Sequence, residues 1–279
     1  MSQHTAALLA RLQHAPAVLV SVDQVQGSGP REQGAWMAVF ADGVINTIGG
    51  GHLEYQALAE ARALLQRSTN TSSSHAQDLV LRYALGPALG QCCGGVVHLR
   101  YQPVNEHSIP SLQQRLKGPQ DAVALFGGGH VGKALVQILG MLPYQVLWID
   151  SRDEIFPVQV PPNVVTEHSD PVQAAVAGLA PGSQVLVMSF SHAEDLDIVA
   201  ACLRRQRERG DLAFIGLIGS QTKWATFRHR LEARGFTGAE LARVTCPIGL
   251  PGITGKEPEV IAVSVAAQLL QSRPLQAGT

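Results

Sequence analysis

The stretch from residue 121 to residue 150 constrains the fold of this chain most. An apolar run, DAVALF, ends in three glycines and is followed by a helical pattern and a second strand, YQVLWID. The glycines fit G-x-G-x-x-G, and an acid ends the next strand about twenty residues on. Glycines allow close backbone approach, and a helix N-terminus attracts phosphate. The pattern predicts a nucleotide-type site made of the loop residues Gly127, Gly129, His130 and Gly132 and of Asp150 at the end of the next strand.

Strand and helix patterns alternate from this loop to the end of the chain. Apolar runs at NVVTEH, QVLVMSF, AFIGLIGS and VTCPIG alternate with helical patterns, which we expect at about 171–179, 193–207, 221–234 and 258–271. This order is typical of a parallel sheet with helices on both faces. Residues 120–279 are therefore predicted to form a Rossmann-type, doubly wound domain. The alternative for its glycine loop is a turn whose nucleotide site is unused.

The first part of the chain has a different pattern. AVLVSVDQV, LVLRYAL and VVHLRYQP are typical of strands, Asp42-Gly43 favours a hairpin turn, and residues 52–67 have helical spacing. We therefore expect an α/β protein in which a small strand-rich N-terminal domain, residues 1–104, precedes the parallel-sheet domain. Residues 105–119 are predicted to be a linker with a short helix.

Two loops of the N-terminal domain have the composition of anion sites. GSGPREQG places the hydroxyl of Ser28 and the guanidinium of Arg31 on a glycine- and proline-rich loop. Gly49, Gly50 and Gly51 run directly into the predicted helix, where their backbone N–H groups would face an anion. The alternative is a structural hairpin turn without a ligand.

A third segment of this domain, Cys92-Cys93-Gly94-Gly95, suggests thiol chemistry. Adjacent cysteines seldom form a disulfide with each other, and the glycines leave the thiols accessible to a metal or an electrophile. The alternative is that cysteine acts as a small buried hydrophobe, which suits Cys202 and Cys246 better. Cys93 and Cys92 are therefore the candidate metal ligands.

Two later strands are followed by polar loops at their carboxyl ends, where open α/β sheets place ligands. SHAED contains His192 and Asp195, three residues apart, and GSQTK ends at Lys223, a cation at a helix start. These three residues are candidate ligand contacts. The alternative in both loops is an ordinary capped helix.

Charge and composition exclude several classes of function. The 279 residues carry 21 basic and 22 acidic side chains, so nothing favours bulk attraction to nucleic acid or to an anionic membrane. No run of about 18 apolar residues and no signal-peptide pattern is present. The four cysteines fit neither a disulfide framework nor a C-x-x-C zinc site. We expect a cytoplasmic protein with free thiols.

Long blocks in both parts of the chain resemble one family, the xanthine dehydrogenase accessory proteins of the XdhC type. In the first part they are GSGPREQGAWMAVFADGVINTIGGGHLEYQALAEAR and QCCGGVVHLRYQP. In the second they are LFGGGHVGKAL, VLWIDSRDEIFP, SHAEDLD, FIGLIGSQTKWATFRHRLEARGF and CPIGLPGITGKEPEVIAVSVAAQLL. The family has one cysteine before Gly-Gly, which aligns with Cys93, whereas Cys92 is an addition.

The resemblance implies a function in purine catabolism without turnover of its own. Such proteins bind molybdenum cofactor (molybdopterin), protect its sulfurated form and insert it into the molybdenum-binding subunit of xanthine dehydrogenase. They work with a cysteine desulfurase and tend to be homodimers. The cofactor is an anionic pterin phosphate with a dithiolene-bound metal, which suits glycine loops and a soft thiol ligand. The glycine loop of the second domain would hold the cofactor phosphate or a nucleotide.

Two other functions remain open at this level. The glycine loop and Asp150 also suit an NAD(P)-dependent oxidoreductase, although the first domain offers no convincing acid–base pair for hydride transfer. A protein-interaction factor whose ligand sites have decayed is the third possibility, against which the intact glycines and the Cys93 turn argue.

Overall fold

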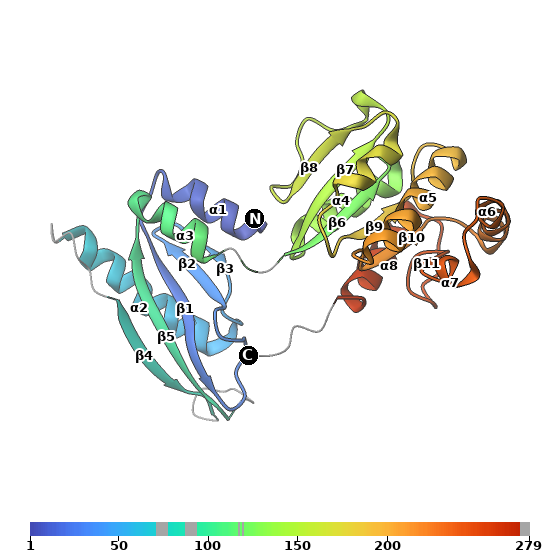
Figure 1. The fold of residues 1–279 in the computed structure, drawn as a ribbon. Coiled ribbons are helices and arrows are strands. Elements are labelled where there is room, and N and C mark those ends of the chain that lie inside the picture. The colour runs from blue at the N-terminus through green and yellow to red at the C-terminus, as the bar shows by residue number, and fades with distance from the viewer. Residues whose placement is uncertain (71–77, 87–93, 117, 119, 274–279) are drawn as a thin grey trace. The chain divides into compact units, whose positions relative to one another are not determined.

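The computed structural model describes residues 1–70, 78–86, 94–116, 118 and 120–273, and the side chains of residues 68–70 are left out. It separates into two compact units, residues 4–117 and residues 118–279 with residues 1–3. Each unit has its own sheet and its own buried core, so each is described by itself (Figure 1).

The first unit is built on a five-stranded antiparallel sheet with the order β3-β2-β1-β5-β4. The strands are β1 (Ala17–Gln26), β2 (Trp36–Phe40), β3 (Gly43–Asn46), β4 (Leu79–Ala84) and β5 (Val96–Val104). The helices are α1 (Gln3–Leu12), α2 (Gly51–Asn70) and α3 (Ile109–Arg115), with a 3-10 turn, η2 (Glu106–Ser108), before α3. The predicted hairpin is present, because Phe40 of β2 pairs with Gly43 of β3.

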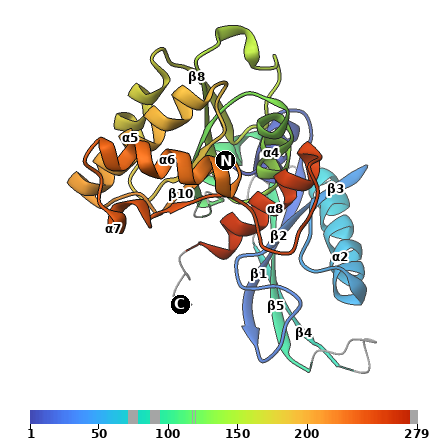
Figure 2. The ribbon, with the colours of Figure 1, turned by 90° about the vertical axis from the view of Figure 1, so that its right-hand side faces the viewer.

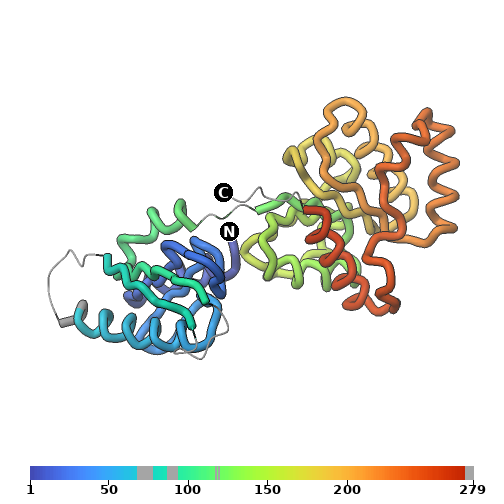
Figure 3. Tube along the Cα trace, turned by 90° about the horizontal axis from the view of Figure 1, so that it is seen from below, coloured from blue at the N-terminus to red at the C-terminus, as the bar shows by residue number. Residues whose placement is uncertain are grey.

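The core of this unit lies between the sheet and α2. Buried side chains of α2 recur every four residues, at Leu53, Ala57, Ala61 and Leu65, as the helical spacing predicted. They pack against buried valines and other apolar side chains of the strands. Figure 3 shows α2 lying alongside the strands. The register of β1 against β5 shifts between Val22 and Gln24, which marks a bulge shortly before β1 ends.

The second unit is a six-stranded parallel sheet with the order β11-β10-β9-β6-β7-β8. The strands are β6 (Asp121–Phe126), β7 (Tyr144–Asp150), β8 (Val164–His168), β9 (Gln184–Val187), β10 (Phe214–Leu217) and β11 (Val244–Thr245). The α-helices are α4 (His130–Met141), α5 (His192–Arg209), α6 (Gln221–Ala233), α7 (Gly238–Leu241) and α8 (Pro258–Gln271).

Helices cover both faces of this sheet, which confirms the doubly wound fold. Val123 and Leu125 of β6 join one buried cluster, with α4 and α8, while Ala124 and Phe126 join the other, with α5. This alternation follows from the two-residue repeat of a strand. Figure 2 shows α4 beside α8.

Two local predictions for this unit need correction or detail. The segment predicted as a helix at 171–179 is a 3-10 helix, η4 (Val172–Gly178), and a further 3-10 turn, η3 (Asp153–Ile155), follows β7. The last strand, β11, has two residues only. Among the described residues, no helix has the length and apolarity needed to cross a membrane.

The strand order also defines where the sheet reverses direction. From β6 the chain moves outward through β7 and β8 on one side, and then returns to place β9 on the other side of β6. The loops after β6 and β9 therefore lie next to each other at the carboxyl edge of the sheet. Ligands of open α/β sheets bind at such a switch point.

Candidate functional site

In the first unit, the Gly27–Arg31 loop lies against two of the predicted glycines, Gly49 and Gly95. A Cβ added at Gly49 would lie 2.6 Å from Cβ of Pro30 and 3.2 Å from Cγ of Arg31. A Cβ added at Gly95 would lie 2.3 Å from the carbonyl oxygen of Ser28. The Gly27–Arg31 loop therefore packs against both the Gly49–Gly51 loop and the start of β5, and glycine is required for these contacts. Cys92 and Cys93 lie outside the described residues.

The Gly49–Gly51 loop is already bonded to a carboxylate of the protein, that of Glu54. Oε2 of Glu54, in the first turn of α2, accepts hydrogen bonds from the backbone N–H of Ile48 (3.0 Å) and of Gly50 (3.1 Å), and from the hydroxyl of Thr47. The same hydroxyl accepts from the N–H of Gly49 at 2.9 Å. The carboxylate lies where the helix dipole favours negative charge. Much of the donor set predicted for a ligand is therefore occupied by the protein itself.

Arg31 lies at the surface in an ion pair with its neighbour. Its Nη2 and Nε lie 3.1 and 3.3 Å from the carboxylate oxygens of Glu32. This hydrogen bonding raises the pKa of the Arg31 guanidinium and lowers the pKa of Glu32. The two side chains are 36% and 72% exposed, and pairs of this exposure contribute little stability. Arg31 is therefore held only by a weak, solvent-exposed pair.

In the second unit, the Gly127–Gly132 loop has the predicted tight geometry. Gly127 has φ of +124°, and a Cβ there would lie 2.0 Å from the carbonyl oxygen of Met188. A Cβ at Gly132 would lie 2.1 Å from the carbonyl oxygen of Gly127, which also accepts from the indole of Trp148 at 2.9 Å. Gly129 faces open space and is the N-cap of α4 without a side-chain hydrogen bond. His130, the first residue of α4, is exposed.

Asp150 lies at the end of β7 as predicted, but its carboxylate is fully engaged. It accepts from the backbone N–H of Gly128 at 2.6 Å and from N, Nε and Nη2 of Arg152, each at 2.9 Å. Burial raises the pKa of Asp150, and the hydrogen bonds from Arg152 and Gly128 outweigh that effect, so the pKa lies below its usual value. A ribose hydroxyl would have to displace Arg152 to reach this carboxylate.

The loops after β9 and β10 are joined by a buried ion pair. Nζ of Lys223 lies 2.7 Å from Oδ2 of Asp195 and donates to the carbonyl of Ile218 at 2.8 Å. The other Asp195 oxygen accepts from both N and Oγ of Ser189, at 2.8 Å. The two side chains are 12% and 3% exposed. The structure thus brings two predicted site residues together, where each neutralises the other.

The helices that follow these two loops, α5 and α6, each have an ordinary N-cap. The hydroxyls of Ser191 and Ser220 accept from the N–H of Glu194 and Lys223, so the capped-helix alternative describes their N-termini. His192 is exposed, and its ring lies edge-on to Phe227 with 6.3 Å between centroids. It does not contact the Gly127–Gly129 loop through any hydrogen bond among the described residues.

Sequence reasoning missed four residues beside this loop. Ser151 and Arg152 follow β7, and Phe190 and Glu194 follow β9. The guanidinium carbon of Arg152 lies 4.5 Å from the ring centroid of Phe190, and the hydroxyl of Ser151 donates to Oε1 of Glu194 at 2.7 Å. The only local signal was Ser191-x-x-Glu194, which is typical of a capping box. The other contacts join segments that are far apart in sequence.

Two of the cavities elsewhere in this unit are lined by charged or thiol side chains. One, of about 620 Å³, lies at the carboxyl ends of β10 and β11 and is lined by Gly219, Cys246, Gly249 and Lys256 among others. Burial raises the pKa of the Cys246 thiol to about 11, which opposes reactivity. Cys202 is buried within the core of this unit.

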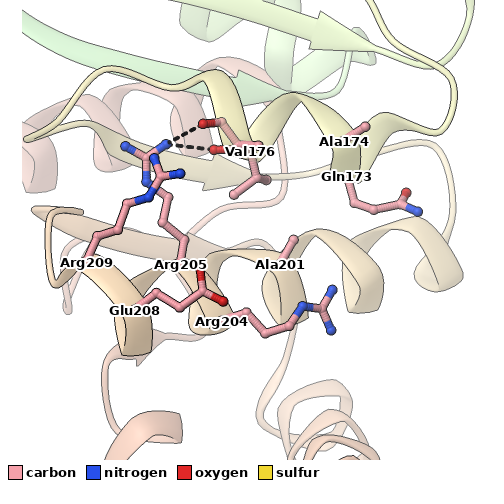
Figure 4. Close-up of a pocket in the computed structure, with 9 residues that line it drawn as sticks. Gln173, Ala174, Val176, Ala201, Arg204, Arg205, Glu208 and Arg209 are labelled. Carbon is pink, nitrogen blue, oxygen red and sulfur yellow. Dashed lines mark hydrogen bonds between the residues drawn. The ribbon is translucent and has the colours of Figure 1, made fainter.

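The other cavity, of about 330 Å³, lies between η4 and the C-terminal half of α5 (Figure 4). Arg204, Arg205 and Arg209 line it. Arg205 donates to the carbonyl of Val176 at 2.7 Å and pairs with Asp211, so this buried guanidinium joins η4 to α5. Among the described residues, no group of three or more histidine, cysteine or acidic side chains could hold a metal ion.

Comparison with known proteins finds matches to the same family in both units. Residues 123–269 match the model of the XdhC Rossmann domain, and residues 10–83 match that of the XdhC and CoxI family. A crystal structure described as a xanthine dehydrogenase from Bacillus halodurans has a TM-score of 0.73 at 20% identity, covering 100% of this chain and 98% of that one. That likeness shows a shared fold.

A curated relative, uncharacterized protein YqeB of Escherichia coli (strain K12), is 27% identical over 262 residues. The match covers 93% of this chain but only 44% of the relative, so this chain spans less than half of the relative's length. The Rossmann-domain model alone covers more than half of the sequence, residues 123–269 of 279, and the second model matches residues 10–83 of the first unit. The chain therefore belongs to the XdhC family.

Proposed function

We propose that this protein carries molybdenum cofactor and inserts it into a xanthine dehydrogenase. The observation that carries the proposal is the match of family models to both units, residues 10–83 and 123–269. The chemistry of the cargo supports it, because the cofactor is an anionic pterin with a terminal phosphate and a dithiolene-bound metal. A carrier needs cationic or N–H donors for the phosphate and a soft ligand for the metal.

The described loops of the first unit offer the donors for an anion, and the sequence offers a thiol two residues before one of them. Arg31 would pair with an anionic group of the cofactor, exchanging Glu32 for it. Ser28 belongs to the same loop, which contacts both Gly49 and Gly95. Gly95 follows Cys93 by two residues in the sequence, so a thiolate from Cys93 or Cys92 would supply the soft ligand. A weak, exposed pair such as Arg31–Glu32 also suits a carrier, which must release its cargo.

The finer features of the function belong to the same proposal. We infer that the protein protects the sulfurated form of the cofactor, receives help from a cysteine desulfurase and acts as a homodimer. The Gly127–Gly132 loop would hold a phosphate of the cofactor or of a nucleotide, because α4 begins there without a side-chain cap. An NAD(P)-dependent oxidoreductase has less support, since Arg152 and Gly128 already occupy the carboxylate of Asp150.

The test is a loading and transfer experiment with the purified chain. The protein is incubated with molybdenum cofactor and separated from free cofactor by gel filtration, and pterin and molybdenum are measured in the protein peak. The loaded protein is then mixed with cofactor-free xanthine dehydrogenase, and its activity is followed. Near-stoichiometric pterin and a gain of activity support the proposal, whereas no pterin in the peak contradicts it.

Variants assign the site within this experiment. Arg31→Met and Cys93→Ala should each lower retained pterin, and Cys93→Ala should lower molybdenum more than pterin. Arg234→Met is the matched control, because Arg234 also forms an exposed ion pair, with Asp197, but lies in the second unit. Equal retention in Cys93→Ala and the wild type would remove this thiol from the site and leave the carrier function intact.

A further inference from the structure

One carboxylate oxygen at the carboxyl edge of the parallel sheet is buried without a partner. Oε1 of Glu194 accepts from the hydroxyl of Ser151 at 2.7 Å, whereas Oε2 is buried and accepts no hydrogen bond from any residue that the structure describes. A buried carboxylate oxygen without a donor costs free energy, so it calls for a partner such as water or a ligand.

Helix capping does not account for this side chain. In α7, the carboxylate of Glu240 reaches back to N and Oγ1 of Thr237, and the capping box is complete. In α5, Ser191 accepts from the N–H of Glu194 in the same way, but the carboxylate does not return to the cap and instead bonds to Ser151. Glu194 is thus directed away from its own helix.

The partner of Glu194 places it beside the glycine loop. Ser151 follows β7, Glu194 follows β9, and β6 lies between these two strands. The Ser151–Glu194 hydrogen bond therefore spans the end of β6, where the Gly127–Gly129 loop begins. A Cβ at Gly129 would contact nothing within 4 Å, and the N-terminus of α4 there has no side-chain cap. An anion-binding helix start and an unsatisfied acceptor thus lie at the same switch point.

A second contact spans the end of β6 in the same direction. Arg152 stacks on Phe190 at 4.5 Å, and the Phe190 side chain is 66% exposed. The hydrogen bond to Asp150 raises the pKa of Arg152, and the charges of Asp150 and Glu194 add to the effect. Both side chains present flat surfaces on which a planar ring can stack.

We propose that Oε2 of Glu194 accepts an O–H or N–H donor of a phosphorylated ligand bound at the Gly127–Gly129 loop. Glu194 would then have the role that the sequence pattern assigns to Asp150, whose carboxylate is saturated. Two sources supply this chemistry: the hydroxyls of a ribonucleotide, or the amino edge of a pterin phosphate. Only the pterin source rests on the proposed function.

A cation is a poorer occupant than a hydrogen-bond donor. Mg²⁺ and Ca²⁺ need several oxygen ligands, and the described residues hold no group of three acidic, histidine or cysteine side chains. The nearby carboxylate of Asp150 is bound to Arg152, and the opposite oxygen of Glu194 is bound to Ser151.

The experiment measures binding by calorimetry with the full-length chain and four probes: ADP, NAD⁺, 6-(phosphooxymethyl)pterin and inorganic pyrophosphate. Wild type is compared with Glu194→Gln, which keeps the size of the side chain, and with Asp197→Asn, an exposed acid of the same helix as control. We expect Glu194→Gln to weaken a donor-bearing probe about tenfold or more, because a ligand donor loses a charged acceptor. Pyrophosphate, which has neither a ribose hydroxyl nor a pterin amino group, should bind both proteins alike.

Each outcome either identifies the ligand class or overturns the inference. Glu194-dependent binding of ADP or NAD⁺ identifies a nucleotide, and Glu194-dependent binding of the pterin probe alone identifies a pterin phosphate. Equal affinity of wild type and Glu194→Gln for every probe, or no binding of any donor-bearing probe at millimolar concentration, overturns the inference. Cofactor loading and transfer are measured separately, so either proposal can fail alone.

A stability measurement separates ligand binding from a structural role. Without ligand, Glu194→Gln should unfold at the same temperature as wild type or higher, because it removes the charge from a carboxylate whose buried second oxygen has no donor. A fall in the unfolding temperature comparable to that of a core substitution would show that Glu194 is structural and would overturn the inference.

Discussion

The Gly49–Gly51 loop and the Gly127–Gly129 loop have similar sequences, but their backbone N–H groups have different hydrogen-bond partners. Each is a glycine run that enters a helix after a strand. In the first, Glu54 holds the N–H groups of Ile48 and Gly50. In the second, Asp150 holds only the N–H of Gly128, and Gly129 begins α4 without a side-chain cap.

The difference shows what glycine at a helix start does and does not indicate. Glycine makes the backbone turn and close approach possible, and it exposes N–H donors. Whether those donors remain available depends on a carboxylate that can come from the same helix or from another strand. Asp195 and Glu240 act as Glu54 does, since each accepts from the backbone N–H of a turn, that of Ser189 and of Thr237 respectively.

The largest effect should come from breaking the buried pair that holds one of these carboxylates. Lys223→Met leaves Asp195 charged, 3% exposed and without its cation, so we expect a loss of about 3–5 kcal/mol in the free energy of unfolding. Urea unfolding of the second unit measures it. Adding Asp195→Asn should restore part of the loss. The exposed pair Arg234–Asp197 is the control, and a cost for Lys223→Met no larger than for Arg234→Met would refute the role assigned to the pair.

The open loop can be tested at two glycines that differ in the space around them. Gly132→Ala places a methyl group 2.1 Å from a backbone oxygen, so we expect a loss of about 3 kcal/mol from forced backbone movement. Gly129→Ala places the methyl group in open space at φ of −69°, and the loss in the free energy of unfolding should stay below about 1 kcal/mol, the cost of alanine in place of glycine at an N-cap. Thermal unfolding of the two variants side by side is sufficient, and equal losses would mean that the loop geometry is wrong.

The sequence predicted what depends on neighbouring residues. The apolar runs and glycines of the second unit specified the strands, the helices and the tight turn at Gly127, because each is a local pattern. The α2 spacing and the Asp42-Gly43 hairpin were predictable for the same reason. The helix predicted at 171–179 is a 3-10 helix instead, which the periodicity of so short a segment does not distinguish.

The candidate site was predicted less completely, because its contacts join distant segments. Asp195 and Lys223 were each identified, but their pairing depends on the order of β9 and β10 in the sheet. Asp150 was placed at its strand end, whereas its saturation by Arg152 was not foreseen. Glu54 and Glu194 were missed, since only the folded chain shows where their carboxylates point.

The comparison of the two glycine loops predicts a gain as well as a loss. Glu54→Gln replaces the charged acceptor of the Ile48 and Gly50 N–H groups by a neutral one, and we expect a cost of about 1 kcal/mol. The same change should let inorganic phosphate stabilise the first unit, whereas phosphate should not stabilise that unit in the wild type. Thermal unfolding with and without phosphate measures both effects. Glu106→Gln, an exposed acid of the same unit, should show neither.

The smallest effect is expected at Glu240, the carboxylate that completes the capping box of α7. Hydrogen bonds from Arg207 and Thr237 lower the pKa of Glu240 to about 2, from a usual value near 4.5. A carboxylate whose folded-state pKa is lowered stabilises the fold above its unfolded pKa and loses that contribution as the pH falls. The difference in unfolding temperature between wild type and Glu240→Gln should therefore be present at pH 6 and shrink between pH 4.5 and 2.

Glu232→Gln is the exposed control, because the carboxylate of Glu232 lies 4.0 Å from Arg228. A difference that stays constant over this range would show that Glu240 contributes through its neutral hydrogen bonds rather than through its charge.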